Sequence, residues 1–138
     1  MRNLVLSILF GAMALVSEVR ADQPAQVLQM LPASVTANLA PTFLGNAVGQ
    51  TGLNGQLNST PPLLFDKVKA ALTKAGWQEQ PIRTSIGPWG FSATWALPSG
   101  ISVDGVASGK QAVLVTQATA LGPKRCNLNI RFEGLTQR

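Results

Sequence analysis

Two stretches of this chain decide its fold: residues 61–77, PPLLFDKVKAALTKAGW, and residues 89–97, WGFSATWAL. In the first stretch, apolar residues recur at the spacing of one helix face. In the second, large apolar residues occupy every other position, which is the spacing of one strand face. The pattern therefore changes from helix to strand, and a helix followed by strands predicts an α+β chain with an antiparallel sheet.

The first stretch predicts a helix from about Pro61 to Ala75. Thr60 can cap the first turn with its hydroxyl, Pro61 suits a position whose N–H has no helical partner, and Gly76 suits a left-handed stop. Trp77 follows that glycine, and we expect it to fold back onto the helix as a buried plug. One face of the helix is apolar and made for burial; it consists of Leu64, Phe65, Val68, Ala71, Leu72 and Ala75.

The second stretch predicts a half-buried strand with Trp89, Phe91, Ala93, Trp95 and Leu97 on its inner face. Residues 126–133 alternate in the same way, with Cys126 among the inward positions. Residues 112–116 are apolar on both sides and predict a central strand covered on both faces, or one whose second face is contacted by the leader. A short strand is expected from Ile82 to Ile86, and residues 98–110 are expected to form an exposed connection with a small strand at 101–103.

These elements predict one amphipathic helix packed on a three- to four-stranded antiparallel meander. We expect this compact domain to span residues 61–138. Residues 22–60 are rich in Gly, Asn, Gln and Pro and predict an irregular or partly disordered leader. An alternative is a strap that lays a few apolar side chains against the body: Val27, Leu31, Leu39, Phe43, Leu44 and Leu53.

Residues 1–21 have the form of a signal peptide. Arg2 precedes an apolar run from Leu4 to Val16, and the residues around Ala21 suit a signal peptidase. The run is shorter than the roughly 20 residues needed to span a bilayer. We therefore expect cleavage after Ala21, a periplasmic or secreted protein and no membrane span in the mature chain, with an uncleaved N-terminal anchor as the alternative.

The composition argues against several kinds of active site. The 138 residues include no His, no Tyr and a single Cys. Without His there is no imidazole base and no His-ligated metal, and one Cys permits no intramolecular disulfide. Cys126 is expected to be a buried small hydrophobe. We therefore predict a chain that is not an enzyme and holds no metal or cofactor.

Two functions remain. The first is a non-catalytic binding or accessory protein that holds a protein partner, with an open sheet face that displays Ser92, Thr94, Asn127, Asn129 and Arg131. The alternative is an anion- or glycan-binding module, suggested by a net charge of +5, in which Trp89 or Trp95 stacks on a sugar. Acidic polysaccharide is then the ligand expected, and nucleic acid is not expected, because no long basic run occurs. The basic candidates are Arg83, Lys110, Lys124, Arg125 and Arg131.

Overall fold

The computed structural model describes residues 24–43 and 51–136, so the predicted signal peptide lies outside it. Within these ranges, no helix is both long and apolar enough to cross a membrane. The helices are α2 (Pro24–Gln29), α3 (Ala33–Thr36), α4 (Pro61–Lys74) and the short 3-10 helix η1 (Pro81–Arg83). The strands are β1 (Ala40–Phe43), β2 (Thr51–Leu57), β3 (Gln78–Glu79), β4 (Ser85–Gly87), β5 (Gly90–Ala96), β6 (Lys110–Gly122) and β7 (Arg125–Thr136).

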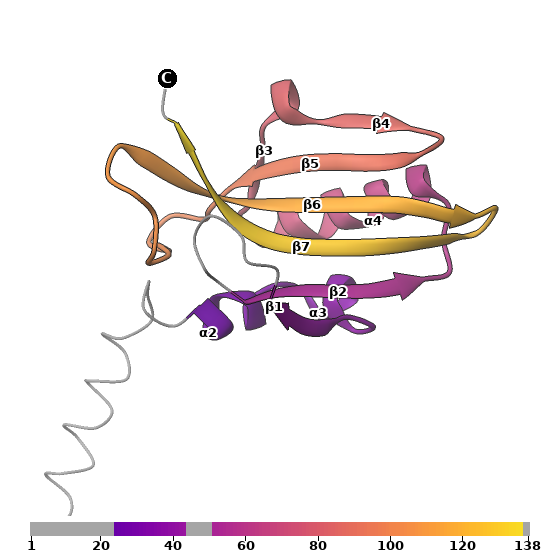
Figure 1. The fold of residues 1–138 in the computed structure, drawn as a ribbon, viewed down its shortest axis with the longest axis horizontal. Helices are drawn as coiled ribbons and strands as arrows, with labels where there is room; N and C mark the ends of the chain where they lie inside the picture. The colour runs from indigo at the N-terminus through magenta and orange to yellow at the C-terminus, as the bar shows by residue number, and fades with distance from the viewer. Residues whose placement is uncertain (1–23, 44–50, 137–138) are drawn as a thin grey trace, which may run out of the picture.

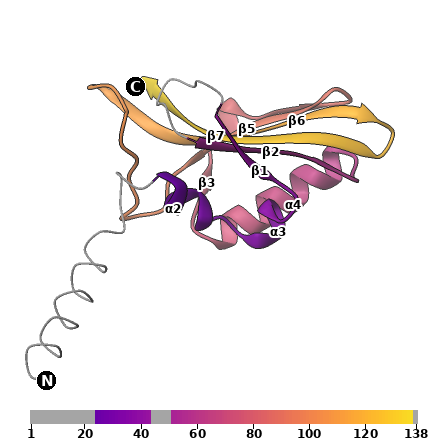
Figure 2. The ribbon, with the colours of Figure 1, turned by 60° about the horizontal axis from the view of Figure 1, so that its bottom comes forward.

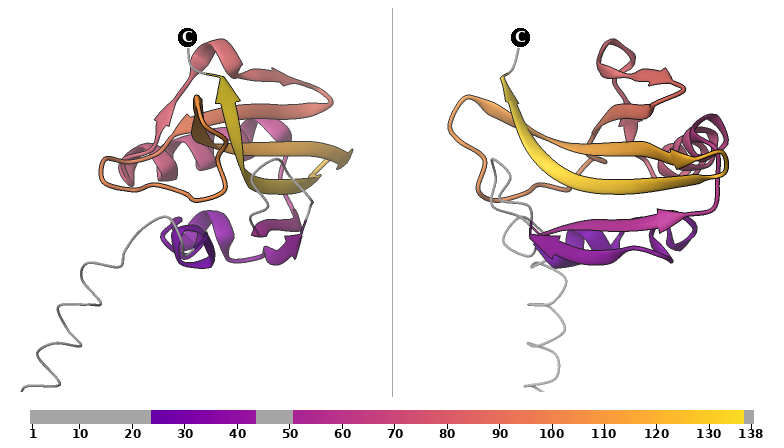
Figure 3. Two further views of the ribbon diagram at one scale, coloured as in Figure 1. Left: turned by 60° about the vertical axis from the view of Figure 1, so that its left-hand side comes forward. Right: turned by 45° about the vertical axis from the view of Figure 1, so that its right-hand side comes forward.

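The seven strands form one antiparallel sheet in the order β1-β2-β7-β6-β5-β3, with β4 also paired to β5 (Figure 1). The long β6–β7 hairpin is its centre. Figure 3 shows this hairpin curving away from the sheet toward the C-terminal end of β7. Such coiling is expected because each strand carries a right-handed twist that accumulates with length.

The predicted α+β fold, with a three- to four-stranded meander behind an irregular leader, is wrong: the described residues form mostly β-sheet, with a single helix longer than six residues. The leader supplies β1 and β2, and β2 pairs with β7 from Leu53↔Ile130 to Leu57↔Cys126. Its glycines suggested a loop, but Gly55 has a packing reason: a Cβ there would collide with the carbonyl oxygen of Asn38. Since the free edge of β7 offers unpaired backbone groups, this glycine-rich segment forms a strand against it.

Smaller expectations also differ from the structure. Residues 81–83 form η1 instead of a strand, since Pro81 starts a tight turn in which the Arg83 N–H donates to the Gln80 carbonyl (2.9 Å). Residues 97–109 are an irregular connection, as predicted, but residues 101–103 are not a strand. Trp89 lies in the β4–β5 turn and not in the following strand. At these positions the backbone forms turns, although the apolar spacing favoured strands.

Helix α4 confirms the prediction for residues 61–75, and its C-terminal end is a complete Schellman motif. Gly76 has φ +95°, the Trp77 N–H donates to the Leu72 carbonyl (3.0 Å) and the Gly76 N–H donates to the Thr73 carbonyl (3.1 Å). Trp77 is buried, as expected of a plug. The expected hydroxyl cap is wrong: Thr60 occupies the N-cap position, but its side chain makes no capping hydrogen bond.

All three α-helices pack on the same face of the sheet (Figure 2). The Phe65 ring of α4 meets the Phe91 ring of β5 edge-on, with centroids 5.3 Å apart. The leader joins this core through Val27 and Leu31, while Leu39 and Leu53 pack at its margin. The contacts expected of a strap are therefore present for these four residues. The side chain of Phe43 and all of Leu44 lie outside the described part.

Candidate functional site

The face of the sheet opposite the helices gathers polar side chains from several strands. The register sets Ser92 beside Gln117 and Gln117 beside Asn129, while Asn129 lies opposite Asn54. Directly paired residues of antiparallel strands share a face, so this row crosses β5, β6, β7 and β2. The five residues predicted for the open face all lie on it: Ser92, Thr94, Asn127, Asn129 and Arg131. We call this surface, with Asn54, Gln117, Thr119 and Glu133, the open face.

Hydrogen bonds tie these side chains into one network. Asn54 and Asn127 exchange bonds of 2.9 and 3.4 Å through their amides, and Asn129 donates to the Asn54 side-chain oxygen (3.4 Å). The Arg131 guanidinium donates to Gln117 Oε1 (3.0 Å) and Asn129 Oδ1 (2.9 Å). A side chain held by two or more partners loses little further freedom when it binds, so the open face is preorganised.

The charges of the open face are balanced. Arg131 Nε lies 2.7 Å from Glu133 Oε2, and the two side chains are 23% and 30% exposed. Arg131 is paired with Val115 in the register and reaches Gln117 two positions along β6, so its stem passes over Val115. Val115 is buried accordingly, and the expected two-sided burial of the central strand is confirmed. The amides and the ion pair together offer hydrogen-bond donors and acceptors without a net charge.

The structure does not bring the five basic candidates together. Lys110 begins β6 at one end of the long hairpin, while Lys124 in the turn and Arg125 at the start of β7 lie at the other end, about 40 Å away along a 13-residue strand. Arg83 belongs to η1 on the far edge of the sheet, and Arg131 is committed to the network. These positions form no single anion site.

The three tryptophans divide into two structural plugs and one surface residue. Trp95 is fully buried on the helix-covered face, where its Nε1–H donates to Thr116 Oγ1 (3.0 Å). Trp89 is 49% exposed, so the expectation that it belongs to the sheet core is wrong. A Gly-Pro turn places it beyond the last paired position of β5, where alternation no longer decides which way a side chain faces.

Cys126 is buried, as the alternation predicts. Its Sγ–H donates to the Ser59 carbonyl (3.2 Å), and burial raises the pKa of the thiol. A thiol that resists ionisation is a poor nucleophile. This contact also fixes the residues before α4 against the beginning of β7.

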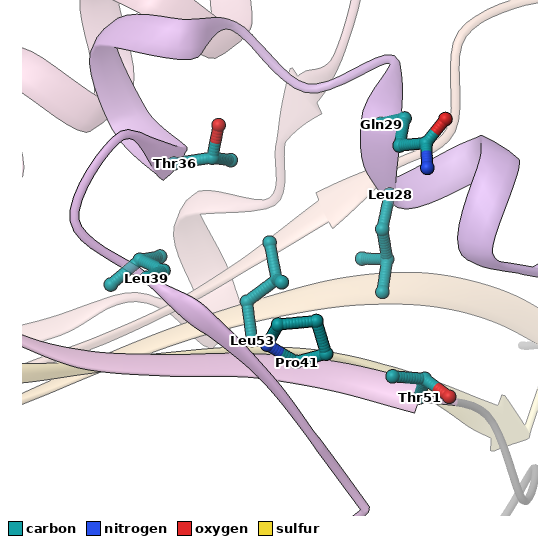
Figure 4. A pocket seen from close by; sticks show the side chains of 7 residues that line it. All are labelled: Leu28, Gln29, Thr36, Leu39, Pro41, Thr51 and Leu53. Atoms are coloured by element: carbon teal, nitrogen blue, oxygen red, sulfur yellow. The ribbon is translucent and has the colours of Figure 1, made fainter.

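A hollow of about 270 Å³ lies between the two short helices and the outer strands (Figure 4). Leu28, Leu53 and Pro41 converge on it, and the amide of Gln29 lies to one side. The remaining lining residues, Thr36, Leu39 and Thr51, add two hydroxyls but no charge. The hollow is therefore suited to an aliphatic group rather than to an ion.

Two members of the open-face network were not predicted from the sequence. Asn54 stands in the segment predicted to be irregular, and Gln117 lies beyond the predicted end of the central strand. Glu133 was predicted to lie on the polar row of its strand, because it follows Asn127, Asn129 and Arg131 at the same two-residue spacing. The pairing of β2 with β7 was needed to place Asn54 beside this row.

Comparison of the chain with protein-family models, with curated proteins and with solved structures finds no match in any of the three.

Proposed function

We propose that this chain is a small exported, non-catalytic binding protein that holds a protein partner on its open face. The observation that carries the proposal is the preorganised, charge-balanced network of Asn54, Gln117, Asn127, Asn129 and Arg131 with Glu133. Side-chain amides present donors and acceptors at once, and protein surfaces present the same mixture. The proposal of export depends on the signal-peptide pattern of residues 1–21.

The charge balance favours a protein over an acidic polysaccharide. A polyanion is held by clustered cations, whereas the one cation in the network, Arg131, already has Glu133 as its counterion. The wide separation of Lys110 from Lys124 and Arg125 also argues against a polyanion site, because these cations cannot act together. The anion-binding alternative is therefore less well supported on this face.

The dimensions of the open face suit a transient complex. Across the sheet, the six strands β1, β2, β7, β6, β5 and β4 span about 24 Å at the usual strand spacing. Along the strand direction, the seven residues of β5 span about 23 Å. The resulting area of about 550 Å² is near the lower limit for specific interfaces, which is about 600 Å² on each partner. We therefore expect binding in the micromolar range of affinity rather than a permanent complex.

Site-specific photo-crosslinking tests the proposal. A photoreactive residue is placed at Thr119, which is exposed on the open face but outside the network, and in a matched control at Ala70, which is exposed on α4. We expect one protein to be captured from position 119 and not from position 70, with a yield that falls at least tenfold when Arg131→Glu is added. Equal capture from both positions, or capture that ignores Arg131→Glu, would refute the use of the open face.

The export part has its own test. The protein recovered from the exported fraction is sequenced from its N-terminus, and a start at Asp22 is expected. A start at Met1, or recovery only from the cytoplasm, would contradict it.

A further inference from the structure

One end of the sheet brings three chain turns together. The Ala120 N–H, at the end of β6, donates to the Trp89 carbonyl in the β4–β5 turn (2.8 Å), so the two hairpin turns lie side by side. The connection from β2 to α4 reaches the same end, because Ser59 accepts the hydrogen bond of Cys126 at the start of β7. Figure 1 shows these turns at the right-hand end of the molecule.

Exposed apolar side chains are concentrated at this end. Six large hydrophobic residues are exposed in the described ranges, and four of them, Leu63, Ile86, Trp89 and Leu121, belong to the elements that meet here. Trp89 is held in place: its indole rests on Gly87, where a Cβ would lie 2.6 Å from Nε1. Exposed large apolar side chains gathered at one end of a molecule mark a surface suited to an apolar contact outside the chain.

Two basic side chains flank these residues. Lys124 is exposed in the β6–β7 turn and Arg125 is exposed as the first residue of β7, and neither makes an ion pair within the ranges that the structure describes. Of the four acidic residues described, Glu79 and Glu133 are paired with Lys69 and Arg131. Asp104 lies in the connection at the opposite end, and Asp66, three residues after Leu63 in α4, is followed directly by Lys67, so Asp66 and Lys67 together add no net charge. The turn end therefore combines apolar side chains with a local excess of positive charge.

We propose that this turn end, formed by Trp89, Leu121, Lys124 and Arg125, docks on the surface of an anionic lipid bilayer. Indole rings favour the boundary between headgroups and acyl chains, and leucine favours the acyl chains. Lysine and arginine next to them bind anionic headgroups. Each residue type on the turn end thus meets one layer of the bilayer surface.

An acidic polysaccharide would suit this end less well. Sugar recognition needs side chains that hydrogen-bond hydroxyl groups around the stacked ring. The other exposed large apolar residues at this end are instead aliphatic: Leu63, Ile86 and Leu121. Docking through this end is separate from the open-face proposal, since a molecule that contacts the bilayer with its hairpin end leaves the open face of the sheet accessible (Figure 2).

Tryptophan fluorescence gives a direct test in the full chain. Trp77 and Trp95 are buried, so Trp89 is the tryptophan that lipid can reach. The protein is mixed with vesicles of phosphatidylcholine containing one quarter phosphatidylglycerol, with or without bromine on the acyl chains. We expect a blue shift and quenching by the brominated lipid, with neither in vesicles of pure phosphatidylcholine. Because the apolar run of residues 4–16 can partition by itself, the readout is Trp89 insertion rather than binding alone.

Paired variants assign the effect to the turn end. The Leu121→Ser variant should insert more weakly than the original chain. The double variant Lys124→Gln with Arg125→Gln should also bind anionic vesicles more weakly, by about fivefold for each charge removed. Ile82→Ser is the matched apolar control, because Ile82 is 92% exposed in η1, outside the turns. Lys110→Gln is the charge control from the other end of β6. Both controls should insert as the original chain does, and so should Arg131→Met on the open face.

Three results would overturn the proposal. They are quenching that is equal in neutral and anionic vesicles, insertion that survives the turn-end substitutions, and no quenching at all. A Trp89 spectral shift with polygalacturonate, in the absence of a response to vesicles, would assign the turn end to acidic polysaccharide instead. A negative result with vesicles does not change the result expected from crosslinking at Thr119, so each proposal can be refuted without the other.

Discussion

The two faces of the sheet are built from the same strands but differ in composition and burial. The helix-covered face is largely apolar and forms the core, with Phe91, Trp95, Leu128 and Phe132 all buried. The open face carries a network of amides around one ion pair. Because side chains alternate along every strand, each strand contributes to both faces. The comparison indicates that stability resides on one face and that the other is free for recognition.

The largest effect should come from the covered face. We expect Trp95→Ala to lower the free energy of unfolding by about 3–5 kcal/mol, through a large cavity and the loss of the partner of Thr116. Trp89→Ala, at the half-exposed tryptophan, should cost about 1 kcal/mol or less. Urea titration followed by circular dichroism measures both. Similar losses in the two variants would contradict the division of roles.

The second effect concerns the backbone that both faces share. Gly90 has φ +142°, and a Cβ there would collide with the Ala118 carbonyl, so Gly90→Ala should cost about 3 kcal/mol. Gly122→Ala, where a Cβ meets nothing within 4 Å, should change stability by less than about 0.5 kcal/mol. Thermal unfolding of the pair is the measurement. A stable Gly90→Ala protein would show that β5 can move away from β6.

The open face should give a smaller effect on stability. Arg131→Met is expected to lower the free energy of unfolding by about 1 kcal/mol, since its partly exposed ion pair and two amide contacts are lost. A double-mutant cycle with Glu133→Gln should give a coupling of about 0.5–1 kcal/mol. A loss as large as that of Trp95→Ala would show that the open face is part of the stabilising core.

The smallest effect is confined to high pH. Burial raises the pKa of the Cys126 thiol in the folded chain, so the unfolded chain ionises first as the pH rises past the ordinary value of about 8.5. Stability linked to this group is complete below that value and is lost as the pH rises toward the folded pKa. The free energy of unfolding, measured from pH 7 to 10, should therefore decrease more steeply with pH in the original chain than in the Cys126→Ala variant. Parallel curves would contradict the burial of the thiol.

The accuracy of the sequence-based predictions followed how local each signal is. Helix α4 was predicted nearly to the residue, because its apolar spacing, Pro61 and Gly76 act within a few positions of one another. The inward rows of β5 and β7 were predicted by alternation. Thr60 shows the limit of such signals, since a residue can occupy the N-cap position without a side-chain hydrogen bond.

By itself, the sequence determined helix α4 with its glycine stop, the burial of Trp77 and Cys126, and the polar row of β7, since these depend on periodicity and on the chemistry of single residues. Only the tertiary structure decided that β1 and β2 complete the sheet, that Asn54 and Gln117 join that row, and that the β4–β5 turn with Trp89 lies beside the end of β6. The physical reason is that strand pairing joins backbone groups distant in sequence. A glycine- and asparagine-rich segment becomes a strand when a free edge lies beside it.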